Sequence, residues 1–282
     1  SIVQRAAASQ KRINEFMFTK PVVKETGHAE MIRPEGDIVL KDVSFTYPHT
    51  GIRALNHINL HIKKGERVLL LGRTGSGKTS LAQLLLRFYE PDTGSIEIGG
   101  RSLREYELMH YREQISYVPQ DVFLFSDTVA DNIAFGLDEA ASRETVAKAA
   151  AMAGVDGDIT QFAQQYDTMI GERGVTLSGG QKQRISIARA LIKQPSLAIF
   201  DDCLSAVDAR TERLIVHNLD KALKGKTAII ITHRIPTDFH FDTIVVLDNG
   251  QIAEMGNHDQ LMELDGLYAE LFRVQRVENH EE

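Results

Sequence analysis

The chain has 282 residues, enough for one large globular domain or two small ones. Its 43% apolar and 25% charged residues are ordinary globular composition, and a net charge of −7 argues against a surface broadly coated for nucleic acid. Cys203 is the single cysteine, so an intramolecular disulfide is excluded.

The first predicted element is a helix over residues 1–17. Apolar and small residues recur there at spacings of three and four: Ile2, Ala6, Ser9, Ile13 and Phe16. Pro21 ends the pattern, and residues 21–36 have the mixed charges, glycines and prolines of a linker. The helix either packs on its own domain or arrives from elsewhere. No apolar run approaches the roughly 20 residues of a membrane span, so we expect this chain itself to be soluble.

Short strands and helices alternate from Asp37 onward, which predicts an α/β fold with a mostly parallel sheet. Period-two spacing places Val43, Phe45 and Tyr47 on one face of the first strand. The other predicted strands are Ile58–Ile62, Arg67–Leu71, Leu197–Asp201, Thr227–Thr232 and Thr243–Leu247. The predicted helices are Thr145–Ala153, Ser178–Ile192 and Thr211–Leu223.

The motif GRTGSGKT, Gly72–Thr79, lies between an apolar strand and a helix. Its glycines let backbone N–H groups curl around a phosphate, and the following helix adds the partial positive charge of its N-terminus. This pattern is typical of a P-loop, in which Lys78 reaches the β and γ phosphates and Thr79 ligates Mg²⁺. The helix after it is expected to present one apolar face formed by Leu81, Leu84, Leu85 and Phe88.

Two further motifs follow. The strand Leu197–Asp201 leads into a second acid, so Asp201 and Asp202 are expected at the sheet edge where the P-loop emerges. Asp201 would hold Mg²⁺, and Asp202 would lie next to the attacking water. In LSGGQKQR, Leu177–Arg184, Ser178 and Gln181 form a predicted capping box at a helix N-terminus, which is a second candidate anion site.

LSGGQ is the signature of ATP-binding cassette (ABC) ATPases, and the whole chain resembles the nucleotide-binding domain of an ABC exporter. The resemblance implies an ABC-type P-loop NTPase with a RecA-like core, an antiparallel β subdomain and a helical subdomain. It also assigns Tyr47 to adenine stacking, Gln120 to sensing Mg²⁺, His233 to the γ-phosphate, and Leu204–Asp208 to the loop that crosses a dimer interface. Without it, Tyr47 would equally be a core aromatic and His233 a strand-end histidine.

Three sets of candidate residues result. The expected ligands of ATP are Tyr47, Gly72, Arg73, Thr74, Gly75, Ser76, Gly77, Lys78, Thr79, Ser80, Ser178, Gly179, Gly180 and Gln181. The expected ligands of Mg²⁺ are Thr79, Gln120 and Asp201. The expected catalytic residues are Lys78, Gln120, Asp202 and His233.

Exporters are the branch of the family that the chain resembles. IGERG, Ile170–Gly174, is similar to an exporter loop that touches the membrane helices, and Gly266–Gln275 is similar to the exporters' terminal helix. The expected boundaries are 1–35 for the end of the last transmembrane helix plus linker, 36–275 for the nucleotide-binding domain, and 276–282 for a polar tail. The helical subdomain is expected at about residues 122–185.

Asp202 departs from the family pattern, in which Glu is usual. The shorter side chain withdraws the carboxylate by about one C–C bond, and a misplacement of about 1 Å can cost on the order of 100-fold in rate. We therefore expect slow hydrolysis at the site that contains Lys78. This favours a heterodimer with a second nucleotide-binding domain, although a slow homodimer is also consistent with the sequence.

The resemblance implies an ATPase motor that couples dimer closure to export, at the cytoplasmic face of the cell membrane. Its partners would be a transmembrane domain and a second nucleotide-binding domain, with no nucleic acid. Two alternatives stay open: a regulatory half with negligible hydrolysis, and a soluble ABC ATPase not linked to transport.

Overall fold

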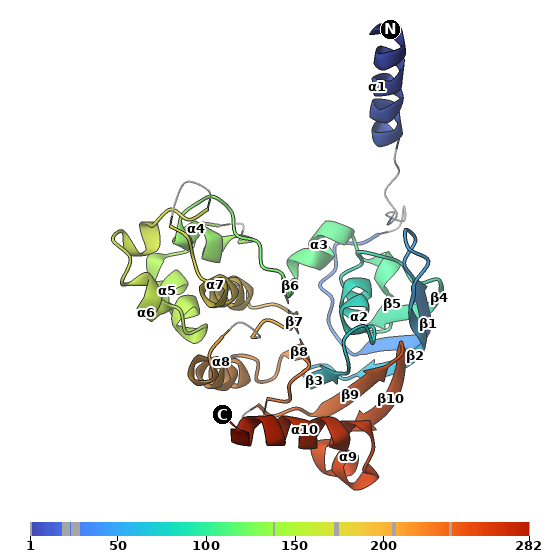
Figure 1. Cartoon of the computed structure of the whole chain (residues 1–282), viewed down its shortest axis with the longest axis vertical. Helices are drawn as coiled ribbons and strands as arrows, with labels where there is room; N and C mark the ends of the chain where they lie inside the picture. Colours follow the sequence, from blue (N-terminus) through green and yellow to red (C-terminus); the bar gives the residue numbers. More distant parts are fainter. Residues whose placement is uncertain are drawn as a thin grey trace.

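The computed structural model describes residues 2–18, 23, 29–137, 139–171, 175–204, 207–236 and 239–281, without the side chains of 209 and 277–281. Figure 1 shows two lobes that meet along a central sheet, with one helix standing apart at the N-terminal end. The lobe on the left is helical, and the lobe on the right carries a second sheet.

The central sheet has six strands in the order β10-β9-β3-β8-β7-β6. Its strands are β3 (Arg67–Leu71), β6 (Ile115–Val118), β7 (Leu197–Asp201), β8 (Thr227–Ile231), β9 (Thr243–Asp248) and β10 (Gln251–Gly256). All neighbours pair in parallel except β9 and β10, which are antiparallel. The mostly parallel core expected from the alternating pattern is thereby confirmed.

Alternate residues of the central strands serve different cores. On β8, Ala228 and Ile230 face the helical lobe, whereas Ile229 and Ile231 face the second sheet. All five residues of β8 are buried. A strand that is covered on both faces has an almost continuous apolar sequence, which is why β8 is recognisable as a strand from the sequence.

The second sheet is antiparallel, in the order β2-β1-β4-β5. Its strands are β1 (Ile38–Thr46), β2 (Arg53–Ile62), β4 (Thr93–Ile98) and β5 (Arg101–Ser102). On β1 the buried positions shift phase between Leu40 and Val43, where the pairing register slips around Asp42. The backbone of Asp42 is left-handed at φ 53°, as expected for a bulge that realigns the inward face. Val43 and Phe45 lie in the same buried core, and Tyr47, predicted on the same face, follows the end of β1 and packs partly buried against that core.

The helical lobe packs on one face of the central sheet. Its elements are α4 (Val129–Ala134), α5 (Arg143–Met152), α6 (Asp156–Ile159), the short 3-10 turn η2 (Gln165–Asp167), α7 (Gly179–Ile192) and α8 (Ala209–Ala222). Helices α5 and α8 begin two residues before the predicted starts, because Ser142 and Asp208 cap them by accepting hydrogen bonds from backbone N–H groups.

One prediction about α2 (Lys78–Leu85) is wrong. Leu81, Leu84 and Leu85 are buried on its apolar face, but Phe88 does not extend that face. The helix ends at Leu85, the chain turns at Arg87 with φ 51°, and the Phe88 side chain is 44% exposed. A left-handed residue just after a helix redirects the chain, so helical spacing no longer applies at Phe88.

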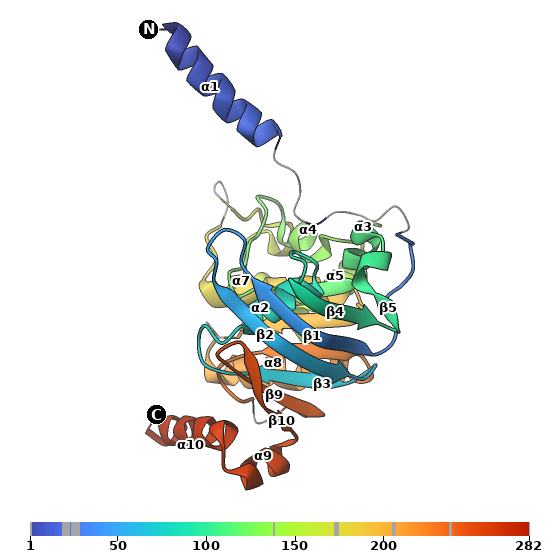
Figure 2. The same ribbon diagram turned by 90° about the vertical axis from the view of Figure 1, so that its right-hand side faces the viewer.

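The remaining helices lie toward the ends of the chain or link strands. They are α1 (Ile2–Met17), the 3-10 turn η1 (Leu103–Glu105), α3 (Leu108–Glu113), α9 (His258–Leu264) and α10 (Leu267–Glu281). Helix α1 has no buried residue and stands away from the core in both ribbon views (Figures 1 and 2). Helix α10 includes residues 276–281 of the expected polar tail, and residue 282 lies outside the described residues. Within the described ranges, every helix is too short or too polar to cross a bilayer.

Candidate functional site

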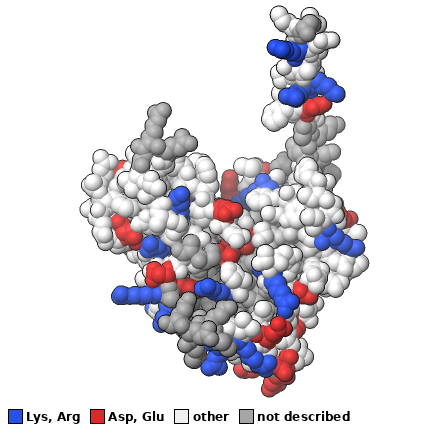
Figure 3. All heavy atoms as spheres, viewed as in Figure 1, with Lys and Arg blue, Asp and Glu red and all other residues white. Residues whose placement is uncertain are grey.

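The candidate site lies at the carboxyl ends of three adjacent parallel strands. The P-loop follows β3, the acid pair ends β7, and His233 follows β8, which pairs with both of the other strands. Loops that leave the same edge of a parallel sheet are held close together, and this edge is where open α/β sheets bind ligands. Figure 3 shows acidic side chains, in red, within the hollow between the two lobes.

The P-loop curls because its glycines adopt backbones that other residues avoid. Gly72, Gly75 and Gly77 have φ of 151°, 81° and 103°. A Cβ on Gly72 would lie 2.2 Å from the Leu247 carbonyl oxygen, and one on Gly77 would lie 2.5 Å from that of Ala54. The two outer glycines are therefore required by close backbone approach as well as by φ.

Lys78 lies inside the curl of the loop. Its ammonium donates to the carbonyl oxygens of Gly72 (2.7 Å) and Arg73 (2.9 Å). Burial lowers the pKa of Lys78, while Asp201 and Asp202 act in the opposite direction. This half-buried cation is partly desolvated, so a phosphate would be a favourable partner for it.

The rest of the loop is also suited to an anion. The Ser76 hydroxyl is buried and has no hydrogen-bond partner among the described residues. Gly77 caps α2 without a side-chain bond, so the first N–H groups of this helix remain available. Arg73, Thr74 and Gly75 form the exposed tip, and Ser80 is buried behind it.

Thr79 and Asp201 form an oxygen-rich pair beneath the loop. The Thr79 hydroxyl donates to Asp201 Oδ1 at 3.2 Å, and the Tyr117 hydroxyl donates to Oδ2 at 3.2 Å. Burial raises the pKa of Asp201, whereas both hydrogen bonds oppose that rise. One hydroxyl and one carboxylate fit Mg²⁺, which binds through one or two protein oxygens, phosphates and water.

Asp202 lies between two of the predicted catalytic side chains. Its Oδ1 is 3.0 Å from Nδ1 of His233, and its Oδ2 is 3.5 Å from Nε2 of Gln120. The Asp202 side chain is only 15% exposed, and its backbone is left-handed at φ 47°. The structure thus brings together Gln120, Asp202 and His233 from three different loops.

Tyr47 stands beside the P-loop helix. Its hydroxyl lies 2.9 Å from the Ser80 hydroxyl and donates to Gln83 on α2, also at 2.9 Å. Its ring meets Phe45 and Tyr89 edge to face. These contacts fix the ring close to the phosphate loop, the position that an adenine platform requires, while its stacking role stays a prediction.

The signature motif caps α7, far along the chain from the P-loop. The Ser178 hydroxyl accepts from the Gln181 N–H at 3.2 Å, and the Gln181 side chain accepts from the Ser178 N–H at 3.0 Å. This is the predicted capping box. Gln181 also donates to Asp158, so its side chain is engaged within the helical lobe. Ser178 and Gly179 are exposed, and Gly180 is half-buried.

Parts of two predicted loops lie outside the described residues. These are 172–174 in the IGERG segment and 205–206 in the segment Leu204–Asp208. Among the described residues, no hydrogen bond or ion pair joins Ser178–Gln181 to the P-loop of the same chain.

Helix α10 supplies residues that the sequence patterns do not reveal. The Gln275 side chain accepts from the Ile235 N–H at 2.6 Å and donates to the Ile235 carbonyl at 2.9 Å. Ile235 is two residues after His233. Glu270 on the same helix lies 3.1 Å from the Arg73 guanidinium in the P-loop. One helix therefore contacts both loops, and helical spacing alone gives no sign of it.

Comparisons with known proteins agree with this geometry. Residues 55–205 match the ABC transporter family, which is more than half of the chain. This chain belongs to the ABC transporter family. It is 42% identical over 272 residues to the ATP-dependent lipid A-core flippase of Vibrio vulnificus (strain CMCP6), covering 96% of this chain and 46% of that protein.

Two further comparisons extend the likeness across this ABC chain. It is 44% identical over 282 residues to the "Probable multidrug resistance ABC transporter ATP-binding/permease protein YheI" of Bacillus subtilis (strain 168), covering all of this chain and 48% of that protein. A solved structure of a bacterial Atm1-family ABC exporter with ATP bound matches with a TM-score of 0.87 and 37% identity, covering 97% of this chain and 48% of that one. The chain spans about half the length of these relatives.

The P-loop geometry predicts different costs for two alanine substitutions. Gly77→Ala should lower the free energy of unfolding by more than the about 1–2 kcal/mol that a left-handed backbone costs an L residue, because its Cβ also meets the Ala54 carbonyl. Gly75→Ala should cost only the backbone contribution, since its Cβ meets nothing within 4 Å. Urea unfolding of both variants measures this, and equal losses would contradict it.

Gln275 is predicted to position the His233 loop. Gln275→Ala removes both bonds to Ile235 and should lower kcat for ATP hydrolysis about ten-fold with little change in KM, because small displacements of a catalytic group are costly. Gln275→Glu keeps the acceptor oxygen, so its kcat should lie between those of the wild-type chain and Gln275→Ala. Val274→Ala, an exposed neighbour on α10, is the matched control. A rise in KM at constant kcat would assign Gln275 to binding instead.

Proposed function

We propose that this chain binds MgATP and hydrolyses it as the motor of an ABC-type exporter. The observation that carries the proposal is the meeting of Lys78, the acid pair and His233 at one edge of the parallel sheet. The named activities of its relatives, lipid A-core flipping and multidrug resistance, support a transport role. ATP binding and hydrolysis would drive domain closure and reopening.

Each predicted side chain has a role that its position supports. Lys78 and the N–H groups at the start of α2 would hold the β and γ phosphates, in the manner of a preorganised anion site. Thr79, Asp201 and Gln120 would hold Mg²⁺, which neutralises charge on the phosphates when bound. Tyr47 would support the adenine.

The hydrolytic step assigns Asp202 as the general base. Its half-buried carboxylate would accept a proton from the water that attacks the γ-phosphorus, while the bond from that phosphorus to the bridging oxygen breaks and ADP leaves. His233, 3.0 Å from Asp202 Oδ1, would orient that carboxylate and contact the γ-phosphate. Gln120 approaches the other carboxylate oxygen and so links the site to the helical lobe.

A second nucleotide-binding domain would complete each site. At the start of α7, no hydrogen bond from the N–H groups of Gly179 and Gly180 occurs among the described residues, whereas the Ser178 N–H is bonded to Gln181 within the helical lobe. A partner's P-loop carrying ATP is the natural ligand for this anion site, so two domains would enclose two nucleotides. Asp202 in place of Glu favours a heterodimer, in which the partner supplies a faster site.

A transmembrane domain is the other proposed partner. A groove of about 230 Å³ is lined by Val122, Phe123, Leu124, Ile170, Val175 and Leu177. Phe123 is 67% exposed beside it, and Phe125 and Phe135 add further exposed aromatic surface. An apolar groove with exposed aromatic rings is typical of a contact site, and an end of a membrane helix pair would fit it. The proposed location is the cytoplasmic face of the membrane, and we propose no nucleic acid partner.

Phosphate release by the purified 282-residue chain tests the motor function. If two copies of this chain pair in solution, the wild-type chain should release phosphate slowly from MgATP, and Lys78→Ala should abolish release by removing the phosphate contact. Asp202→Glu should raise turnover, because the longer side chain returns the carboxylate by about one C–C bond toward the water. An unchanged or lower rate in Asp202→Glu would count against Asp202 as a misplaced base.

Phosphate release also distinguishes the motor function from a second candidate function. Asp202 also supports a regulatory half that binds ATP with negligible hydrolysis. That role predicts nucleotide binding in the wild-type chain, loss of binding in Lys78→Ala, and no release above the Lys78→Ala background.

Complementation between two variants tests the pairing. Lys78→Ala disables the P-loop, and Ser178→Arg disables the signature, so homodimers of either have no complete site. If copies of this chain pair with each other, an equal mixture should recover about a quarter of wild-type activity, from one intact site in half of the dimers. The heterodimer predicts no recovery, so recovery would overturn it.

A further inference from the structure

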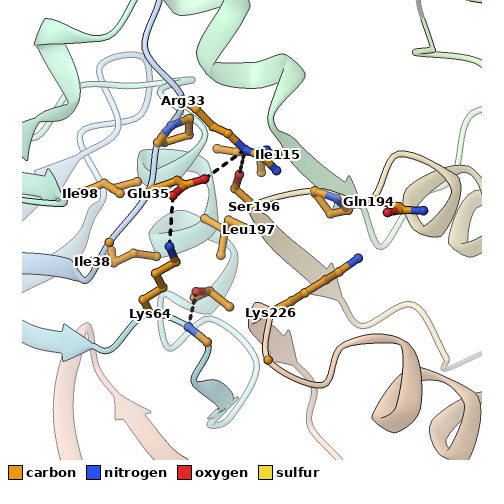
Figure 4. Close-up of a pocket in the computed structure, with 16 residues that line it drawn as sticks. Arg33, Glu35, Ile38, Lys64, Ile98, Ile115, Gln194, Ser196, Leu197 and Lys226 are labelled. Carbon is orange, nitrogen blue, oxygen red and sulfur yellow. Dashed lines mark hydrogen bonds and ion pairs between the residues drawn. The ribbon is translucent and has the colours of Figure 1, made fainter.

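A second pocket lies at the end of the central sheet opposite the nucleotide site. It is lined by residues 33–36 ahead of β1, the turn 64–65, residues 194–197 entering β7, and residues 225–227 entering β8. Its volume is about 260 Å³ (Figure 4). The segment that follows α1 in the chain therefore forms one wall of a cavity whose other walls belong to the core.

Two cations on one side of the pocket share a single carboxylate. Arg33 Nε donates to the Ser196 hydroxyl at 2.9 Å and lies 3.6 Å from Glu35 Oε1. Lys64 Nζ donates to Glu35 Oε2 at 3.1 Å. Figure 4 shows these contacts as one connected chain of dashed lines. These contacts orient Arg33 and Ser196, but the single carboxylate of Glu35 neutralises only one of the two positive charges.

Lys226 reaches the pocket from the other side. Its side chain is half-buried, and no hydrogen bond or ion pair to it occurs among the described residues. Burial lowers the pKa of Lys226, and repulsion by Arg33 lowers it further. A cation that is partly desolvated and repelled by another cation is stabilised when an anion binds near both.

The floor of the pocket is apolar. Ile38, Ile98, Ile115 and Leu197 line it, and none of these side chains is more than 4% exposed. Small-molecule sites typically combine such an apolar surface with a few convergent polar groups. The volume is slightly below the usual range of about 300–1,000 Å³ for ligand pockets, which limits the occupant to a small molecule.

We propose that this pocket binds a small phosphate monoester with a short apolar body. The phosphate would lie between Arg33 and Lys226 and accept from the Ser196 hydroxyl, while the carbon chain would cover the isoleucine floor. Three cations against one carboxylate leave two positive charges to be matched, and a phosphate monoester carries close to two negative charges at pH 7. Guanidinium, ammonium and hydroxyl donors together are a typical phosphate-binding set.

Binding there would connect two parts of the chain that are far apart in sequence. Arg33 precedes β1, whereas Ser196 and Lys226 precede β7 and β8, the strands that end at Asp201 and lead to His233. The ligand would add a contact between the entering segment and the catalytic core. Because it binds only the folded arrangement, it should also stabilise the fold.

Calorimetric titration with hexyl phosphate tests the proposal. Because the P-loop is another phosphate site, the titration uses the 282-residue chain carrying Lys78→Ala. We expect saturable binding of one equivalent, weaker binding of inorganic phosphate, and no binding of hexanol. Adding Lys226→Ala or the longer Lys226→Gln should weaken hexyl phosphate binding by about ten-fold or more, as expected for loss of a charge-assisted contact.

Lys224→Ala is the matched control, since Lys224 is an exposed lysine in the same turn. It should leave the affinity unchanged, and the folded state of every variant is checked by its unfolding midpoint. Equal affinity with and without Lys226 would overturn the proposal. Binding of hexanol as tight as that of hexyl phosphate would overturn it too, by showing an apolar cavity without an anion site. Binding that occurs only when Lys78 is present would assign the phosphate to the P-loop.

Discussion

Backbone hydrogen bonds between β3, β8 and β7 determine where three of the proposed catalytic groups lie, namely Lys78, Asp202 and His233. Leu70 pairs with Ile231, and Asp201 pairs with Ile231 from the other side. This register ends the three strands at one level, so that the P-loop, the acid pair and the His233 loop leave the sheet together. A slip of one residue would exchange the side chains of β8 between the two cores, so that Ile229 and Ile231 would face the helical lobe and disturb its packing.

The parts of the site that the sequence predicts are those with local causes. The P-loop is recognisable because its glycines are required within eight residues, and the capping box because Ser178 and Gln181 contact each other within one helical turn. The buried strands are recognisable because burial on both faces makes them uniformly apolar. These features need no knowledge of distant contacts.

The features that the sequence does not reveal have distant causes. Strand β6 has only four residues, Ile115–Val118, and is a strand because it pairs with β7 from 82 positions farther along the chain, as with Ile115 and Leu197. Phe88 continues a helical spacing after the helix has ended, since the turn at Arg87 follows from packing. Gln275 contacts Ile235 across 40 residues, and its residue type gives no hint of that partner.

The contacts of α10 have a consequence for the order in which the molecule is completed during synthesis. Translation proceeds from the N-terminus, so Arg73 leaves the ribosome 197 residues before its partner Glu270. The contact between the His233 loop and α10 likewise forms only after Gln275 is made, 40 residues after Ile235. A nascent chain therefore carries the P-loop long before the helix that braces both loops exists. The contacts of α10 with these two loops can therefore form only after the rest of the domain has been made, and an interrupted chain would lack them.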